Sequence, residues 1–144
     1  MSTVSQIMTK QVKSVGPKAS IAGVAKTMRT ARVGSLFVKK GKQLVGVVTD
    51  TDIVRRAVAT GKPLGRLTVE KIMTTPICTI EGSRPVDDAQ DMMGDLGVRH
   101  LAVTSGGTIV GVVSVRDLLM HYKRYAQSTL PPAMGYSEPK IGQD

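Results

Sequence analysis

Two short stretches of the sequence place a hydroxyl side chain three residues before an aspartate. They are GVVTDTD at residues 46–52, which contains Thr49 and Asp52, and GVVSVRD at residues 111–117, which contains Ser114 and Asp117. A carboxylate accepts hydrogen bonds from both hydroxyls of a cis-diol, and a nearby hydroxyl can reach the sugar or its first phosphate. The same spacing is that of a capping box, in which both side chains bond the backbone at a helix start. The pattern therefore predicts helix caps or ribose sites, and one pair of side chains can serve as both.

The two stretches are parts of an internal repeat. Shifting the chain by 65 residues, the offset from Gly46 to Gly111, places IMT at residues 7–9 on IMT at residues 72–74 without a gap. The same shift places VGSLFV at residues 33–38 on VRHLAV at residues 98–103. A register that holds over so many positions indicates two copies of one structural unit.

In each copy, the periodicity of the apolar residues predicts the order strand, helix, strand, strand, helix. The elements are expected near residues 12–15, 21–28, 36–38, 44–48 and 51–60 in the first copy, and near 77–80, 86–96, 101–103, 109–113 and 115–125 in the second. Gly61 stands where a left-handed cap closes the helix at 51–60. One copy is too small to bury its own sheet face, so we expect an α/β sandwich with the two sheets packed together and the helices outside.

The repeat divides the chain into residues 7–65, residues 66–125 and a tail of residues 126–144. Paired prolines and mostly small or polar residues predict an irregular or disordered tail. No apolar run approaches the roughly 20 residues that span a bilayer, and the start of the chain lacks the apolar core of a signal peptide. We therefore expect a cytoplasmic protein.

Catalytic and metal-binding groups are scarce. The chain has two histidines, His100 and His121, and one cysteine, Cys78, and no two of them lie close together in the sequence. This spacing favours neither a metal cluster nor a pair of nucleophile and base. We expect no enzyme activity, no metal and no required cofactor, with Cys78 as a small reduced core residue.

The positive charge is concentrated in the first copy. The net charge is +9, and residues 1–65 contain 12 Lys and Arg against Asp50 and Asp52. This leaves open a nucleic-acid or acidic protein partner, although aromatic residues, at 3%, are few for stacking single-stranded bases. The first long helix is basic in one copy and acidic in the other, which favours head-to-tail pairing of two chains. The residues concerned are Lys26, Arg29 and Arg32, and Asp87, Asp88, Asp91 and Asp95.

With IMT opening each copy and GVVTDTDI or GVVSVRDL closing it, residues 7–124 resemble the cystathionine-β-synthase (CBS) domain pair, also called a Bateman module. The resemblance implies two β-α-β-β-α repeats related by pseudo-twofold symmetry, with two clefts between them. It also implies a regulatory module that binds an adenine nucleotide, AMP, ADP or ATP, and signals its level to an effector protein or through its own assembly, commonly a homodimer. Members that bind S-adenosylmethionine, or no ligand, leave these two alternatives open.

The resemblance further implies that each cleft is composite. The Ser/Thr-x-x-Asp residues of one repeat bind ribose, and the backbone in the opening segment of the other repeat recognises adenine. Thr49 and Asp52 then belong with residues 74–80, and Ser114 and Asp117 with residues 9–15. The implied adenine-binding positions are Thr9, Lys10, Val12, Lys13, Val15, Thr74, Ile77, Cys78 and Ile80.

Phosphate contacts are implied for Arg99, His100 and Arg116. Residues before the middle strand face the phosphates in the family, and by position Arg99 and His100 are assigned to the second cleft, with Gly34 and Ser35 in the first. A charge-assisted contact contributes roughly 1.5–3 kcal/mol, against about 1 kcal/mol for a neutral hydrogen bond. We therefore expect the second cleft to bind phosphate more tightly.

Overall fold

The computed structural model describes residues 1–10, 12–129, 139, 140 and 142. They form two three-stranded sheets, one in each repeat, with the same topology. In each sheet the first strand runs parallel to the middle strand, and the third runs antiparallel to it. The first sheet consists of β1 (Ser14–Val15), β2 (Ser35–Lys40) and β3 (Gln43–Thr49), and the second of β4 (Thr79–Glu81), β5 (His100–Ser105) and β6 (Thr108–Ser114).

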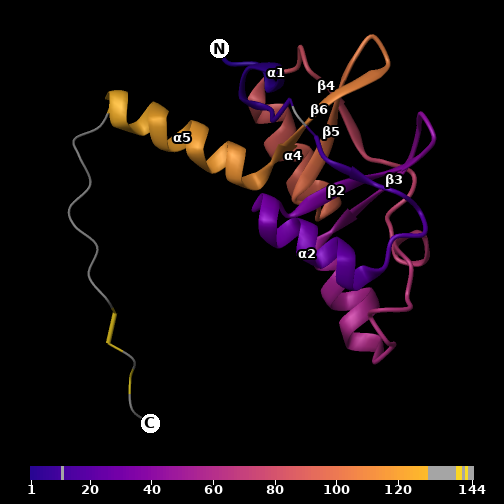
Figure 1. The fold of residues 1–144 in the computed structure, drawn as a ribbon. Coiled ribbons are helices and arrows are strands. Elements are labelled where there is room, and N and C mark those ends of the chain that lie inside the picture. The colour runs from indigo at the N-terminus through magenta and orange to yellow at the C-terminus, as the bar shows by residue number, and fades with distance from the viewer. Residues whose placement is uncertain (11, 130–138, 141, 143–144) are drawn as a thin grey trace.

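The helices follow the predicted order, and α5 extends away from the two sheets (Figure 1). In the described part of the chain they are α1 (Val4–Ile7), α2 (Ile21–Ala31), α3 (Asp50–Asp52), η1 (Ile53–Ala57), η2 (Val58–Thr60), η3 (Val69–Lys71), α4 (Val86–Leu96) and α5 (Val115–Thr129). The predicted fold, a pair of β-α-β-β-α units, is confirmed. None of these helices is long and apolar enough to cross a membrane.

Some elements differ from the sequence prediction. The opening strands β1 and β4 are shorter than expected, because the residues before them lie against the other repeat. The helix predicted at residues 51–60 is irregular: α3, the π turn η1 and the 3₁₀ turn η2 follow one another, and Gly61, with φ 71°, closes the segment as predicted. The helix α5 continues to Thr129, past its predicted end at residue 125. Within the predicted irregular tail, residues 130–138, 141, 143 and 144 lie outside the described residues.

Each repeat has its own apolar core, but the segment before the first strand of each repeat packs into the core of the other. Val69 and Ile72, which precede β4 of the second repeat, lie in the first core with Leu36. Val4, from α1, lies in the second core with Leu101. Full burial of such a side chain contributes about 1.5–3 kcal/mol. This exchange ties the two repeats together.

The exchanged segments also pair with the last strand of the opposite sheet. Thr74 exchanges backbone hydrogen bonds with Val47 in β3, at 2.7 and 3.1 Å, and Thr9 does the same with Val112 in β6, at 2.8 and 3.0 Å. The pairing fixes where each crossing segment runs. It brings residues 74–78 over the end of β3, where Thr49 begins the next helix.

Gly46 and Gly111 make this close passage possible. A Cβ atom at Gly46 would lie 2.7 Å from Met73 Sδ, and one at Gly111 would lie 2.6 Å from the carbonyl oxygen of Thr9. Contacts this short require the neighbouring atoms to move. Both copies of the repeated phrase therefore begin with glycine because another backbone segment passes directly over that position.

Candidate functional site between the two repeats

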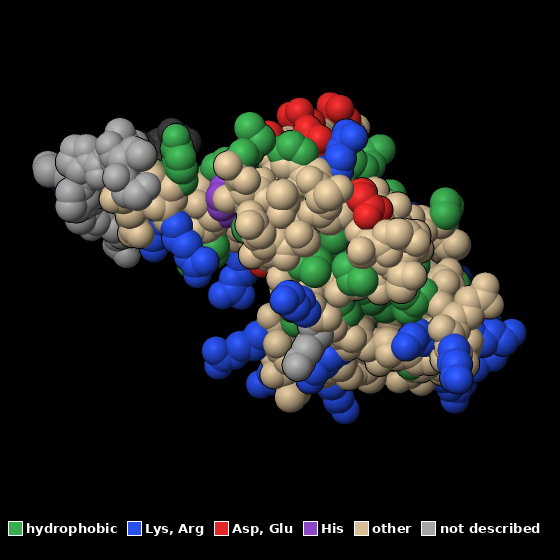
Figure 2. All heavy atoms as spheres, turned by 90° about the horizontal axis from the view of Figure 1, so that it is seen from above, with side chains coloured by type: hydrophobic (Ala, Val, Ile, Leu, Met, Phe, Trp, Pro, Cys, Tyr) green, Lys and Arg blue, Asp and Glu red, His purple; other side chains and the backbone are tan. Residues whose placement is uncertain are grey.

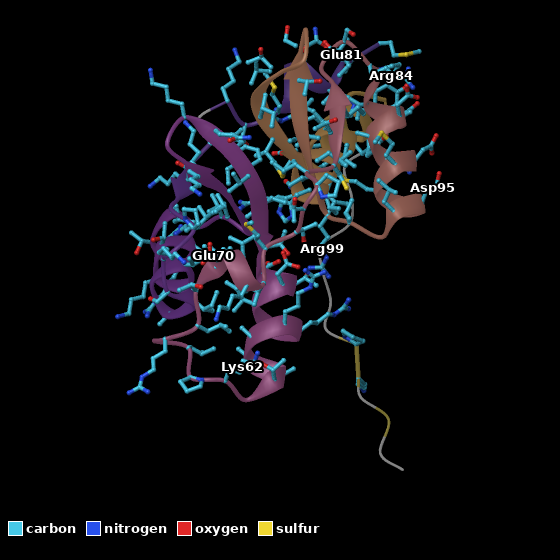
Figure 3. The ribbon with its side chains drawn as sticks, turned by 90° about the vertical axis from the view of Figure 1, so that its right-hand side faces the viewer. Lys62, Glu70, Glu81, Arg84, Asp95 and Arg99 are labelled. Carbon is cyan, nitrogen blue, oxygen red and sulfur yellow. The ribbon has the colours of Figure 1, made fainter. Side chains whose placement is uncertain are left out.

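A cavity of about 410 Å³, here called the first cleft, opens between the two repeats. Its walls come from both sheets, from helical residues 51–56, from the crossing segment before β4 and from the loop before β5. Figure 3 shows Arg99 between the two repeats, close to the start of that helical segment. The polar and charged residues that line the first cleft are Thr49, Thr51, Asp52, Arg55, Arg56, Thr74, Cys78, Arg99 and His100.

Thr49 and Asp52 form the predicted capping box. The Thr49 N–H donates to Asp52 Oδ2 at 3.0 Å, and the Asp52 N–H donates to Thr49 Oγ1 at 3.1 Å. Asp52 is only 7% exposed, so its charge requires further partners. The hydroxyl of Thr74, from the second repeat, lies 3.2 and 3.3 Å from the two carboxylate oxygens. The first repeat's hydroxyl and aspartate therefore meet the opening segment of the second repeat, as the composite cleft requires.

Ser114 and Asp117 form the same box at the start of α5. The backbone N–H and the hydroxyl of Ser114 both donate to Asp117 Oδ2, at 2.8 and 3.0 Å, and the Asp117 N–H donates to Ser114 Oγ at 3.2 Å. Thr9 is the counterpart of Thr74, but among the described residues no hydrogen bond joins Thr9 to Asp117. The capping prediction is confirmed in both copies, and the link across the repeats is present in the first alone.

Arg99 and His100 line the first cleft, together with Thr49 and Asp52. The structure thus places both residues on the wall of the first cleft, whereas the sequence assigned them by position to the cleft of Ser114 and Asp117. The carbonyl of Arg99 accepts a hydrogen bond of 2.9 Å from the Val115 N–H, which holds its backbone in the second repeat. Its side chain nevertheless lies along the cavity that the first repeat helps to form. The position of Arg99 within its repeat therefore did not determine which cleft its side chain lines.

His100 lies where the two repeats meet. Burial lowers the pKa of His100 below its ordinary value of 6.5, and the nearby Asp50 carboxylate opposes this effect. A Cβ atom at Gly34 would lie 3.4 Å from His100 Nε2, and the buried Nδ1 has no hydrogen-bond partner in the described part of the chain. The lowered pKa favours the neutral ring, which has one N–H donor to offer a ligand.

Arg55 and Arg56 were not predicted from the sequence to belong to the site. Both line the first cleft, and Arg56 Nη1 donates to the Ile72 carbonyl at 3.2 Å. Arg56 Nε also lies 3.8 Å from Asp52 Oδ1. The sequence did contain a signal for them. Arg55 and Arg56 follow Asp52 by three and four residues on the same helical segment, and side chains at this spacing share a helix face.

The predicted adenine-binding positions lie in different places, and only some of them line the first cleft. Thr74, Ile77 and Cys78 line the first cleft. Ile80 is 4% exposed and belongs to the second core, away from the cavity. Among the remaining positions, Lys10 and Val12 line a separate cavity of about 190 Å³, Thr9 and Val15 pair with neighbouring strands, and Lys13 is exposed.

Arg116, predicted to contact phosphate, is exposed at the start of α5. Neither of the two cavities is lined by Arg116, Ser114 or Asp117. Within the described residues, no group of three or more His, Cys, Asp or Glu side chains could hold a metal ion.

A protein-family model described as the CBS domain matches the chain twice, over residues 4–59 and 69–124. The chain is 39% identical over 117 residues to an uncharacterized 17.7 kDa protein of Acidianus ambivalens, covering 80% of this chain and 70% of that protein. A crystal structure of an uncharacterized conserved protein from Pyrococcus horikoshii is 30% identical, with a TM-score of 0.81 over 92% of this chain and 97% of that one. The hexameric CBS-CP12 protein from bloom-forming cyanobacteria is 27% identical, with a TM-score of 0.75 over 83% of this chain and 70% of that one.

Proposed function

Because the chain belongs to the CBS domain family, we propose that it is a regulatory module that binds an adenine nucleotide, AMP, ADP or ATP, in the first cleft. Tandem CBS domains are generally regulatory ligand-binding modules, and proteins of this kind are typically non-catalytic. The volume of the first cleft, about 410 Å³, lies within the range of roughly 300–1,000 Å³ that small-molecule sites occupy.

One observation carries the proposal: Asp52 is a buried carboxylate at the cavity wall with unused capacity to accept hydrogen bonds. Its Oδ2 accepts from the Thr49 backbone, and the single hydroxyl proton of Thr74 is shared between its two oxygens. A carboxylate offers about four acceptor positions. Asp52 can therefore cap its helix and still accept hydrogen bonds from both hydroxyls of a ribose.

Away from Asp52, the wall of the first cleft is apolar, which suits a nucleobase. Val47, Ile77 and Val112 line the cavity as apolar side chains, next to the irregular backbone of residues 74–78. A flat base packs against apolar side chains, while backbone N–H and C=O groups can bond its polar edge. In the proposed complex the base packs against Val47, Ile77 and Val112, and the sugar lies at Asp52.

The same arrangement supplies a mechanism for regulation. Since the walls belong to both repeats, a bound nucleotide favours the arrangement in which the two repeats close on it. A change in that arrangement can be transmitted to an effector protein or to the assembly of the chain with a second copy.

For the assembly we propose a head-to-tail homodimer, in which α2 of one chain faces α4 of the other. Lys26 and Arg29 are exposed on α2, and Asp91 and Asp95 are exposed on α4. Figure 2 shows acidic side chains gathered at one edge of the molecule, with most Lys and Arg side chains in that view toward the opposite side. Opposite charges favour contact between α2 and α4, whereas two α4 helices would repel each other.

The test of nucleotide binding is isothermal titration calorimetry with AMP, ADP, ATP and S-adenosylmethionine, supported by thermal shift. Asp52→Ala should weaken binding of the preferred nucleotide about ten- to a hundredfold, because hydrogen bonds to a charged group contribute roughly 1.5–3 kcal/mol. Asp117→Ala removes the equivalent cap in the second repeat and is the matched control, with a smaller expected effect.

This order of effects is the reverse of the one expected from the sequence, because Arg99 and His100 line the first cleft. Two results contradict the proposal. One is binding that Asp52→Ala leaves unchanged, and the other is the absence of binding by every nucleotide tested.

A further inference from the structure

Two arginines line the first cleft without an acidic partner. Arg55 belongs to the first repeat and Arg99 to the second, and both side chains border the cavity. None of the ion pairs formed by the described residues includes either of them. Asp52 is the sole acidic residue among those that line this cavity. The first cleft therefore has more positive than negative charge.

The charge of Asp52 does not compensate Arg55 or Arg99. Asp52 is already paired with Arg56, at 3.8 Å, and Arg56 is held in place by the Ile72 carbonyl at 3.2 Å. Asp52 and Arg56 thus offset each other inside the site. Two guanidinium charges, one from each repeat, are left for a ligand.

The irregular helix explains how two successive arginines reach one cavity. Successive side chains of an α-helix, with 3.6 residues per turn, point about 100° apart. Arg55 and Arg56 lie in the π turn η1, in which the N–H of Val58 donates to the carbonyl of Ile53, five residues earlier. A π turn holds more residues, so consecutive side chains differ less in direction, and such turns are frequent at functional sites.

The second repeat lacks this arrangement. At the offset of 65 residues, Arg55 corresponds to Met120 and Arg56 to His121, and both lie in α5, which is a regular helix from Val115 to Thr129. Arg99 corresponds to Gly34 at the same offset, so the pair of Arg55 and Arg99 is a property of the first cleft and is not repeated in the other copy.

We infer that the first cleft selects ligands with two or more linked phosphates over those with one, through the joint action of Arg55 and Arg99. The inference rests on the proposed function for the position of the sugar at Asp52. A guanidinium forms two parallel hydrogen bonds with a single phosphate. Because the two guanidinium groups border one cavity from opposite repeats, a diphosphate offers each of them a phosphate of its own, whereas a monophosphate offers one phosphate for both to share.

The first experiment tests the phosphate subsite without a nucleoside. Calorimetry compares inorganic pyrophosphate with inorganic phosphate, in the presence of a chelator, for the full chain and for Arg55→Ala, Arg99→Ala and the double variant. We expect pyrophosphate to bind at least about tenfold more tightly than phosphate, and each single substitution to remove most of that difference. Arg66→Ala, which deletes an exposed arginine outside the cavity, is the matched control and should change neither affinity.

The second experiment repeats the comparison with AMP, ADP and ATP. ADP and ATP should lose about ten- to a hundredfold in affinity with either single substitution. AMP should lose only a few-fold, because the remaining arginine can still bind its single phosphate. In the double variant all three nucleotides should bind with similar affinity.

The outcomes separate this inference from the proposed function. If AMP binds as tightly as ADP and ATP, or if each substitution weakens all three equally, the inference is wrong and the proposed function stands. If pyrophosphate binds through Arg55 and Arg99 but no adenine nucleotide binds, the inference about linked phosphates stands and adenine recognition is wrong. If neither pyrophosphate nor any nucleotide binds, both are wrong.

Discussion

The two capping boxes, Thr49 with Asp52 and Ser114 with Asp117, are alike, but their surroundings differ. Asp52 is buried and bonded across the repeats to Thr74, whereas the hydrogen bonds of Asp117 stay with Ser114. Both copies contain the cap, which begins the next helix, and the glycine that leaves room for a crossing segment. The side chains that surround a potential ligand differ, as Arg55 and its counterpart Met120 illustrate. The two copies thus share what the fold requires and differ in what a ligand would contact.

The largest expected effect concerns the two glycines, which have different neighbours. A Cβ at Gly111 meets the backbone carbonyl of Thr9 at 2.6 Å, whereas at Gly46 the nearest atom is the flexible Met73 side chain at 2.7 Å. Overpacking typically costs 1–3 kcal/mol. We expect Gly111→Ala to lower the free energy of unfolding by about 3 kcal/mol and Gly46→Ala by about 1 kcal/mol, measured by urea denaturation.

Gly94 provides the control for this comparison. It lies within α4, and a Cβ there would meet no atom within 4 Å. Gly94→Ala should therefore stabilise the protein by roughly 0.5–1 kcal/mol, the usual gain in a helix interior. Equal destabilisation by Gly46→Ala and Gly111→Ala would mean that the two crossing segments are equally rigid. It would contradict the expected difference between a backbone neighbour at Gly111 and a side-chain neighbour at Gly46.

Much of this fold was predictable because the repeat reveals the elements twice. The strand and helix order, the two capping boxes and the cap at Gly61 all follow from local spacing, which acts over a few residues. The exchange of Val4 and Val69 between the cores was not predicted, since it depends on packing between distant segments. The place of Arg99 on the wall of the first cleft was not predicted, for the same reason. Its position in the repeat was correct, but the direction of its side chain depends on the relative placement of the two repeats.

A second comparison concerns α2 and α4, which have the same place in the two repeats and opposite charge. Exposed ion pairs contribute roughly 0.2–1 kcal/mol each. Reversing Asp91 and Asp95 to Lys should therefore weaken a head-to-tail dimer about two- to thirtyfold, measured by analytical ultracentrifugation at low salt. Adding Lys26→Glu and Arg29→Glu to the same chain should restore the dimer. A monomeric wild-type chain, or a dimer that the first reversal leaves intact, would overturn the proposed interface.

The smallest expected effect comes from His100, which has Ser35 as its counterpart in the first repeat. Burial lowers the pKa of His100, and Arg99 lowers it further, while the carboxylates of Asp50, Asp117 and Asp52 raise it. The lowering causes prevail. The unfolded chain, in which the histidine has its ordinary pKa near 6.5, therefore binds a proton more readily than the folded chain does.

The sign of the pH dependence follows from this difference. Stability from His100 is fully present above pH 6.5 and is lost as the pH falls from 6.5 toward the lower pKa of the folded state, because protonation then favours the unfolded chain. Urea denaturation at pH 7.5 and 5.5 measures the loss. His100→Ser, which introduces the residue found at the aligned position, should lose less stability over this interval than the wild type does, since the variant no longer carries a group that must stay neutral in the folded state. An equal loss in both proteins would show that other groups control the acid sensitivity. It would also contradict the lowered pKa of His100 in the folded chain.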